Sequence, residues 1–242
     1  MCIRDSQKIM AEVLKDNNLH GGICTLVIGE ADLGKMLSAD KRVPLVSATG
    51  STRMGKSVGK VVGERLGKSL LELGGNNAVI LTPEADLKMV IPALVFGAVG
   101  TTGQRCTSTR RLIIHESIYE NVKNAMVNAY GQLQIGDPLD ESNHVGPLID
   151  KDAVNMYLKA IDSAKKEGGN VIVEGGTLDG EGYESSCYVK PVIIEAENHF
   201  EIVQHETFAP ILYLIKYSGD VNDAIAIQNL SLIHISEPTR PY

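Results

Sequence analysis

The sequence predicts an α/β protein built around a mostly parallel sheet. Apolar segments of strand length alternate with amphipathic segments along the chain, which is typical of doubly wound α/β folds. The composition agrees, since 43% of the 242 residues are hydrophobic, 22% are charged and 5% are aromatic. A glycine pair, Gly74 and Gly75, interrupts the alternation. We therefore expect two parts, over residues 7–74 and 75–230.

The first part shows repeated changes between strand and helix. Apolar residues at helical spacing predict a helix over 7–17, and a continuous apolar run predicts a buried strand over 23–29. The segments that follow predict, in order, a short helix over 31–40, a strand over 43–51, a helix over 51–67 and a strand over 70–75. This order is that of parallel strands joined by crossover helices.

The second part predicts a further α/β unit. Its segments predict strands over 77–82, 110–116, 170–174, 188–194 and 209–216, and helices over 86–97, 117–133 and 151–166. A glycine-rich turn spans 175–183. The two ends, 1–6 and 231–242, break the pattern of their neighbours, so we treat both as non-native flanks and exclude them from fold reasoning. Frayed native tails are the alternative.

Charge and hydropathy exclude two classes of partner. A net charge of -7 argues against nucleic-acid binding, because such proteins normally carry a basic surface. The longest apolar runs, such as residues 91–100, are about half of the ~20 residues that cross a bilayer. We therefore expect no membrane span, and the start of the chain does not resemble a secretory leader.

Cysteine and histidine spacing indicates neither a metal site nor disulfides. The four cysteines are scattered without a CxxC pair or a Cys/His pair at ligand spacing: Cys2, Cys24, Cys106 and Cys187. The six histidines are equally scattered, and none is a candidate ligand. A reducing compartment is the default for such a chain, so we expect a cytoplasmic protein.

The segment GSTRMG, Gly50 to Gly55, is the first candidate for chemistry. It leads from a predicted strand into a predicted helix, and its glycines allow a ligand to approach the backbone. The free N–H groups at a helix start suit a phosphate. The segment lacks the full G-x-G-x-x-G fingerprint. A helix that is only N-capped, by Ser51 or Thr52, is the alternative.

Two further residues have candidate catalytic roles. Glu72 ends an apolar strand just before the two glycines, where open α/β sheets build their clefts, so it could act as a general base. An edge-strand glutamate that faces water is the alternative. Cys106 follows a flexible turn and lies beside Arg105, in positive surroundings that favour a thiolate. A small buried side chain is its alternative.

Taken together, GSTRMG, LELGG (71–75), GQRC (103–106) and ETFAP (206–210) resemble the aldehyde dehydrogenase superfamily. The order and the spacing of the four motifs agree with that family, and the similarity covers residues 7–230. LELGGNNAVI, GTTGQRCTSTRRLIIHESIYE, KKEGGNVIVEGG and HETFAPILY are most similar to the antiquitin group, the α-aminoadipic semialdehyde dehydrogenases of lysine catabolism. The resemblance implies the end of a Rossmann-like nucleotide-binding domain over 7–74, followed by an incomplete catalytic domain of the aldehyde dehydrogenase type over 75–230.

The resemblance assigns roles to individual residues. It makes Cys106 the nucleophile, with its N–H as one half of an oxyanion hole, and Glu72 the base that activates water for thioester hydrolysis. Glu206 would bind the nicotinamide ribose, Phe208 would pack beside the ring, and Arg105 would pair with a substrate carboxylate or remain a surface arginine. The other implied cofactor-binding residues are Gly50, Ser51, Thr52, Gly55 and Leu73.

The implied reaction is oxidation of an aldehyde to a carboxylic acid through a cysteine thiohemiacetal and a thioester. The implied cofactor is NAD, with NADP not excluded, and the implied assembly is a homo-oligomer, a dimer or a tetramer. A thiol hydrolase that uses Cys106 without a nucleotide and a piece without catalytic activity are the two other hypotheses.

The chain also departs from the family. Its members are longer, and we expect their oxyanion-hole asparagine and ribose-binding lysine to lie upstream of this segment and their oligomerisation strand downstream. The chain therefore looks like an internal fragment. An open sheet without its neighbouring strands exposes apolar surface, so we expect poor solubility and little activity from these 242 residues alone.

Overall fold

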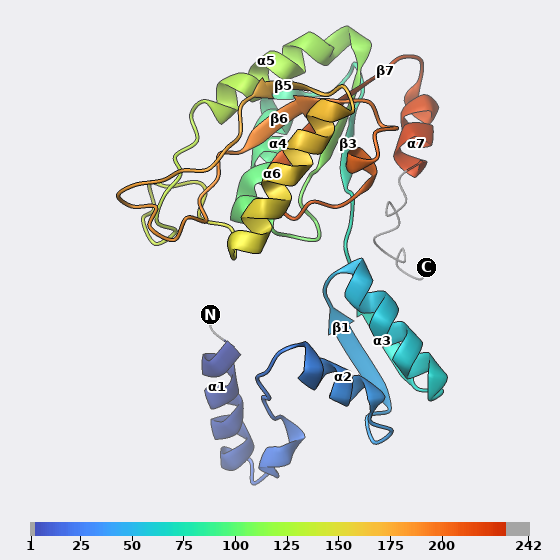
Figure 1. Cartoon of the computed structure of the whole chain (residues 1–242), viewed down its shortest axis with the longest axis vertical. Helices are drawn as coiled ribbons and strands as arrows, with labels where there is room; N and C mark the ends of the chain where they lie inside the picture. Colours follow the sequence, from blue (N-terminus) through green and yellow to red (C-terminus); the bar gives the residue numbers. More distant parts are fainter. Residues whose placement is uncertain (1–2, 231–242) are drawn as a thin grey trace. The chain divides into compact units, whose positions relative to one another are not determined.

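The computed structural model describes residues 3–230, which divide into two compact units (Figure 1). Unit 1 ends at Glu72 and unit 2 begins at Leu73. The segment 231–242, which the sequence marks as a flank, lies outside the described residues, as do residues 1–2 of the other flank.

Unit 1 contains three helices and a pair of parallel strands. The elements are α1 (Ile3–Asp16), α2 (Ala31–Ala39), β1 (Leu45–Thr49), α3 (Thr52–Glu64) and β2 (Lys68–Glu72). β1 pairs with β2 from Leu45 opposite Lys68 to Thr49 opposite Glu72. The predicted alternation of helix and strand is thus present from α2 onward.

Two predicted elements of unit 1 differ in the structure. The strand expected over 23–29 is wrong, because a single 3-10 turn, Gly21–Ile23, is followed by irregular backbone. Val27 and Ile28 in this stretch are exposed. The apolar run therefore does not pair with another strand within residues 3–230. Helix α1 begins at Ile3 rather than near Gln7, with Asp5 in its first turn and Lys15 in its last, an arrangement that complements the helix dipole.

Unit 2 is built on a five-stranded sheet with the order β3-β4-β7-β6-β5. Its strands are β3 (Ala78–Leu81), β4 (Arg111–His115), β5 (Asn170–Val173), β6 (Val192–Glu195) and β7 (Ile211–Tyr217). All neighbours are parallel except β5 and β6, which are antiparallel. β6 is shorter than the strand expected over 188–194, and it begins directly after Pro191, which lacks an N–H for the ladder.

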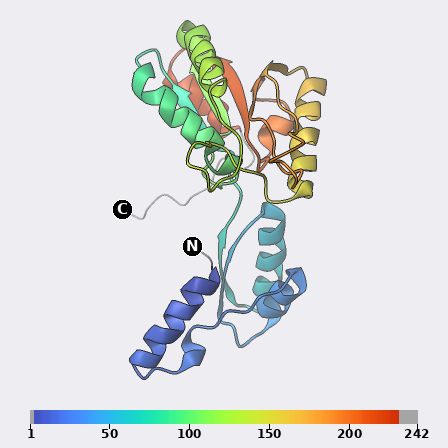
Figure 2. The same ribbon diagram turned by 90° about the vertical axis from the view of Figure 1, so that its left-hand side faces the viewer.

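Helices cover both faces of this sheet. They are α4 (Leu87–Val99), α5 (Tyr119–Tyr130), α6 (Lys151–Lys166) and α7 (Val221–Asn229). Figure 2 shows α4 and α5 on one side of the sheet and α6 on the other, and Ala224 of α7 belongs to the same buried cluster as α6. The α/β prediction is confirmed, with unit 2 as a three-layer sandwich.

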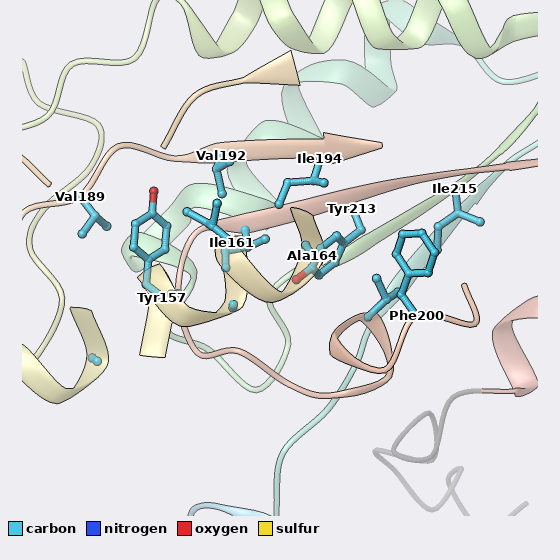
Figure 3. Packing of buried hydrophobic residues seen from close by; sticks show 14 of the residues in the cluster. Tyr157, Ile161, Ala164, Val189, Val192, Ile194, Phe200, Tyr213 and Ile215 are labelled. Carbon is cyan, nitrogen blue, oxygen red and sulfur yellow. The ribbon is translucent and has the colours of Figure 1, made fainter. Parts of the chain in front are cut away.

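Strand alternation divides the side chains of β7 between the two faces. Leu212 and Leu214 pack with α4 and α5, whereas Tyr213 and Ile215 pack with α6. Figure 3 shows Tyr157, Ile161 and Ala164 of α6 directed toward the strands. The core of unit 2 therefore lies on both sides of the central strands. The loops described below connect to the ends of these strands. Within residues 3–230, every helix is too short or too polar to cross a bilayer.

Candidate active site

The loop that carries Cys106 joins α4 to β4, and we call residues 100–110 the nucleophile loop. It begins with three consecutive left-handed residues, Thr101 (φ 52°), Thr102 (φ 57°) and Gly103 (φ 66°). A threonine is strained in this region, so the turn needs support from its surroundings. A Cβ on Gly103 would lie 2.5 Å from the Ala209 carbonyl oxygen, so only glycine fits where the loop packs against the segment before β7.

Side chains of the same loop bond it to residues 146–149. The Thr102 hydroxyl donates to the Gly146 carbonyl at 2.9 Å, and the side-chain oxygen of Gln104, Oε1, accepts from the Ile149 N–H at 2.9 Å. The Gln104 amide donates to the Pro147 carbonyl at 3.3 Å. The base of the loop is thus fixed while Cys106, further along, is exposed. The buried alternative for this cysteine is therefore wrong.

The segment that follows the glycine pair supports the loop from the other side. The Asn77 amide donates to the Cys106 carbonyl at 2.6 Å and to the Ser108 carbonyl at 3.0 Å. A Cβ on Gly75 would lie 2.9 Å from the same Cys106 oxygen. The glycine therefore lets the two backbones approach, and the asparagine bonds them together.

Glu206 lies in a nearly closed polar environment beside this loop. Its carboxylate accepts from the Gly75 N–H at 3.2 Å and forms a 3.5 Å ion pair with Arg110, whose side chain is only 3% exposed. Burial lowers the pKa of Arg110, and the attraction of Glu206 opposes that shift. The Arg110 guanidinium also lies 5.5 Å from the ring centre of Phe208, which is partly exposed. Glu206 and Phe208 are thus held together next to the nucleophile loop.

Arg105 lies at an apolar cavity of about 480 Å³ on unit 2. Its guanidinium carbon is 5.2 Å from the ring centre of Phe96. The cavity lies between α4, α5 and the nucleophile loop, and its lining includes Ile91, Val95, Phe96, Arg105, Leu133 and His144. This arrangement places a cation at a largely apolar cavity, one residue before Cys106 in the sequence.

Unit 1 carries the remaining predicted residues. Ser51 is the N-cap of α3 and accepts from the Met54 N–H at 3.1 Å, as the capping alternative for this segment requires. The Gly50 N–H donates to the Glu72 carbonyl at 3.0 Å, which ties the start of α3 to the end of β2. Glu72 itself is the last residue of β2, and its side chain is exposed.

A cavity of about 550 Å³ adjoins the first turns of α3 within unit 1. It lies between α2, β1 and α3, and its apolar lining includes Leu37, Val46, Ala48, Met54, Val58 and Val61. This volume is in the range of small-molecule sites. The sequence motifs did not point to it, because the lining comes from three elements whose contact is tertiary.

Comparison with known proteins identifies the family to which these features belong. The profile of the aldehyde dehydrogenase family matches residues 6–233. The chain belongs to the aldehyde dehydrogenase family. α-Aminoadipic semialdehyde dehydrogenase of Bos taurus is 50% identical over 214 residues, which are 88% of this chain and 39% of the bovine protein. Aldehyde dehydrogenase family 7 member A1 of Pisum sativum is 44% identical over 222 residues, 92% of this chain and 43% of the pea protein.

Solved aldehyde dehydrogenases share the fold. Betaine aldehyde dehydrogenase of Staphylococcus aureus, in complex with NAD+, superimposes with a TM-score of 0.80 and 27% identity over 84% of this chain and 40% of that one. A 3,6-anhydro-L-galactose dehydrogenase in complex with NADP gives a TM-score of 0.81 and 27% identity, over 84% of this chain and 43% of that one. The chain thus spans about two fifths of the length of the aldehyde dehydrogenases that it matches.

The structure distributes the predicted site residues over both units. In unit 2, Arg105 and Cys106 lie on the nucleophile loop, and Glu206 and Phe208 lie on the segment that Arg110 joins to it. Leu73 is the first residue of this unit. Unit 1 holds Gly50, Ser51, Thr52, Gly55 and Glu72 where β1 and β2 end and α3 starts. The catalytic and cofactor-binding roles of these residues stay predictions that follow from the aldehyde dehydrogenase motifs.

Sequence reasoning missed Arg110 and Asn77. Arg110 was visible as a positive charge near Cys106. Nothing in the sequence indicated that it is buried between the nucleophile loop and the segment before β7. Asn77 stands 29 positions before Cys106, and only the parallel pairing of β3 with β4 brings the two together. In residues 3–230, no three His, Cys, Asp or Glu side chains are arranged to hold a metal ion.

Proposed function

We propose that this chain contributes the nucleophile, the hydrolytic base and part of the cofactor site to NAD(P)-dependent oxidation of an aldehyde. The observation that carries the proposal is the exposed Cys106 on a loop that Arg110 joins to Glu206. An exposed thiol beside a fixed carboxylate suits a covalent reaction in which a cofactor is bound next to the nucleophile.

The chemistry begins at Cys106. Its thiolate attacks the aldehyde carbon, a C–S bond forms, and the carbonyl oxygen takes the negative charge. The Cys106 N–H stabilises this oxygen as one donor of an oxyanion hole. The tetrahedral thiohemiacetal could then give up a hydride, for which a nicotinamide cofactor, when bound, would supply the acceptor. The carbon is thereby oxidised to a thioester.

Hydrolysis completes the reaction. Glu72 takes a proton from a water molecule, the water oxygen adds to the thioester carbon, and the C–S bond breaks. A carboxylic acid leaves and the Cys106 thiolate is restored. An exposed carboxylate at the end of β2 is accessible to water, as this role requires.

The aldehyde dehydrogenase motifs in each unit lead us to propose a nicotinamide dinucleotide as the cofactor. The first N–H groups of α3, with Gly50 and Ser51 at the turn, would hold the pyrophosphate. The adjoining cavity of about 550 Å³ has the volume of a small-molecule site, and we propose that it takes the adenine base. Glu206 would accept hydrogen bonds from the nicotinamide ribose, with Phe208 beside the ring. We propose NAD as the cofactor and leave NADP open.

The substrate proposed is a semialdehyde with a carboxylate, such as α-aminoadipic semialdehyde. Arg105 offers a guanidinium next to Cys106 at the rim of the 480 Å³ cavity, where it could bind a carboxylate in bidentate fashion. The bovine relative, at 50% identity, carries that substrate in its name. We accordingly propose that residues 7–74 and 75–230 are parts of a nucleotide-binding and a catalytic domain.

The test uses a chimera in which this chain replaces the matching segment of the bovine relative, which supplies the rest of that protein's length. We expect NADH formation from α-aminoadipic semialdehyde, complete loss in Cys106→Ala, and a much lower rate from the 242-residue chain alone. In Arg105→Met we expect a raised KM for the semialdehyde and an unchanged KM for an aldehyde without a carboxylate. Turnover that persists in Cys106→Ala would contradict the nucleophile. Ester cleavage without any NAD-dependent step would favour the thiol hydrolase instead.

A further inference from the structure

The buried Arg110 donates hydrogen bonds to four backbone carbonyls. Its Nη2 donates to the Gly103 carbonyl at 3.2 Å and to the Arg105 carbonyl at 3.1 Å, on the nucleophile loop. Its Nη1 donates to the Thr207 carbonyl at 2.7 Å and to the Ala209 carbonyl at 3.4 Å, on the other side. One guanidinium therefore joins the segments that carry Cys106 and Glu206.

The bond to the Arg105 carbonyl has a direct consequence for Cys106. The Arg105 C=O and the Cys106 N–H belong to the same peptide unit, which is planar and trans. In such a unit the N–H points opposite to the C=O. When Arg110 holds the Arg105 oxygen, it also sets the direction of the Cys106 N–H.

The neighbouring bonds hold the same stretch of backbone. The Arg105 carbonyl also accepts from the Ser108 N–H at 3.1 Å, so both of its lone pairs are occupied. The next carbonyl, that of Cys106, accepts from Asn77 at 2.6 Å. Both peptide units that flank the Cys106 Cα thus have fixed orientations, although the cysteine side chain itself is exposed.

We propose that Arg110 is a positioning residue that aims the Cys106 N–H at the developing oxyanion by holding the Arg105 carbonyl. The inference rests on the proposed function, because it assumes that Cys106 attacks a carbonyl carbon. A planar fork with five donors can bond four carbonyls on two segments at once, whereas a lysine amine has three donors at one point. The geometry of the guanidinium, and not only its charge, is therefore required.

Two reactions of the Cys106 thiol separate this role from a simple effect of charge. Acylation by p-nitrophenyl acetate forms a C–S bond, places negative charge on the carbonyl oxygen and expels p-nitrophenolate, so it needs the N–H donor. Alkylation by iodoacetamide displaces iodide at a saturated carbon and forms no oxyanion. Neither reaction needs NAD, so both can be measured on the chimera described above without added cofactor.

The experiment compares Arg110→Met and Arg110→Lys with the unchanged chimera, following the p-nitrophenolate burst and, by peptide mass spectrometry, alkylation at Cys106. We expect acylation to fall by about tenfold or more in both variants, since loss of an oxyanion donor reduces rates by about 10²–10³. We expect alkylation in Arg110→Lys to stay within about twofold, because the charge remains. Arg65→Met is the matched control: Arg65 donates to the Ser38 carbonyl at 2.8 Å and the Val43 carbonyl at 2.7 Å, in unit 1. Its acylation rate should not change.

The outcomes distinguish the inference from the function beneath it. Equal losses of acylation and alkylation in Arg110→Lys would overturn the positioning role, and so would normal acylation in either Arg110 variant. If Arg110→Met does not fold, Arg110→Lys decides the question alone. Absence of a burst from the unchanged chimera, or a burst that survives Cys106→Ala, would instead contradict the nucleophile itself and the inference with it.

Discussion

The two units differ in how their sheets are covered. In unit 2 every residue of β7 except Lys216 is buried, and apolar clusters fill both faces of the sheet. In unit 1 the residues of β1 alternate between exposed and partly buried, and those of β2 are exposed except for Leu71. The same strand-helix alternation therefore gives a sheet buried on both faces in unit 2 and a largely exposed strand pair in unit 1.

Unit 1 has fewer apolar side chains packed against its two strands than unit 2 has against its five. Two strands are rarely stable without further packing, and unit 1 leaves large apolar side chains exposed: Ile9, Met10, Val13, Leu19, Ile23, Val27, Ile28, Met36, Leu37, Leu45, Leu66 and Leu70. The nucleophile loop, whose geometry must be fixed, is attached to the unit with the packed core. We therefore expect unit 1 to unfold before unit 2, and the following substitutions test this contrast.

The largest expected effect comes from a central strand of unit 2. Leu212 on β7 is fully buried between α4 and α5, so Leu212→Ala should lower the free energy of unfolding of unit 2 by about 3 kcal/mol. Leu70 on β2 is 55% exposed, and Leu70→Ala should change stability by only about 0.5 kcal/mol. Urea unfolding followed by circular dichroism measures both. Equal effects of the two substitutions would show that the burial contrast does not govern stability.

A buried hydroxyl in unit 2 tests the same contrast with a smaller change. Tyr157 on α6 donates to the Lys190 carbonyl at 2.5 Å and accepts from the Gly176 N–H at 2.9 Å, and its ring is fully buried. Tyr157→Phe leaves both backbone groups without this partner and should cost about 2 kcal/mol in urea unfolding. Tyr183 is a less buried control with one bond, to the Ile135 carbonyl at 3.0 Å. A smaller loss in Tyr157→Phe than in Tyr183→Phe would contradict the expectation.

Most of the fold was predictable because helices and strands leave periodic patterns. The helix over 151–166 was predicted with the bounds of α6, where apolar spacing and the N-cap Asp150 agree. The failure at 23–29 has a physical cause, since an apolar run has the composition of a buried strand whether or not a neighbour pairs with it. At β6 the proline at position 191 marked the strand start, but the apolar residues before it suggested a longer strand.

The candidate site was predictable only where its residues stand within a local sequence motif. Cys106 and Glu206 stand within recognisable motifs, but the contacts that hold them connect distant positions, such as Arg110 and Thr207, 97 residues apart. No local pattern shows that an arginine beside a strand is buried and bonded to four carbonyls. The packing of the nucleophile loop against the segment before β7 is a tertiary property.

In unit 1, loss of the Ser51 N-cap of α3 should destabilise the whole unit and not the helix end alone. Ser51→Ala removes the bond to the Met54 N–H, which should cost about 1 kcal/mol. Because α3 packs on β1 and β2 in a unit with little buried apolar surface, we expect faster amide hydrogen exchange throughout 45–72 and unchanged exchange in β7. Ser51→Asp, which can also cap, is the matched control and should restore protection. Changed exchange in β7 would contradict the expectation that the effect stays within unit 1.

The smallest expected effect lies at the periphery of unit 2. Burial tends to raise the pKa of Glu195, but hydrogen bonds from Asn170 (2.7 Å), Lys123 (3.1 Å) and Tyr119 (3.1 Å) outweigh it and hold the pKa below the usual 4.5. The folded state thus binds this proton less readily than the unfolded state, so the stabilisation is present above about pH 4.5 and is lost as the pH falls through the lowered value. Glu195→Gln should lower stability by about 1 kcal/mol or less at pH 7 and by nearly nothing once Glu195 is protonated. Thermal unfolding of both chains between pH 7 and pH 3 measures the difference, which should shrink on acidification. A difference that grows toward low pH would reverse the sign of the linkage and show that the three donors do not stabilise the carboxylate.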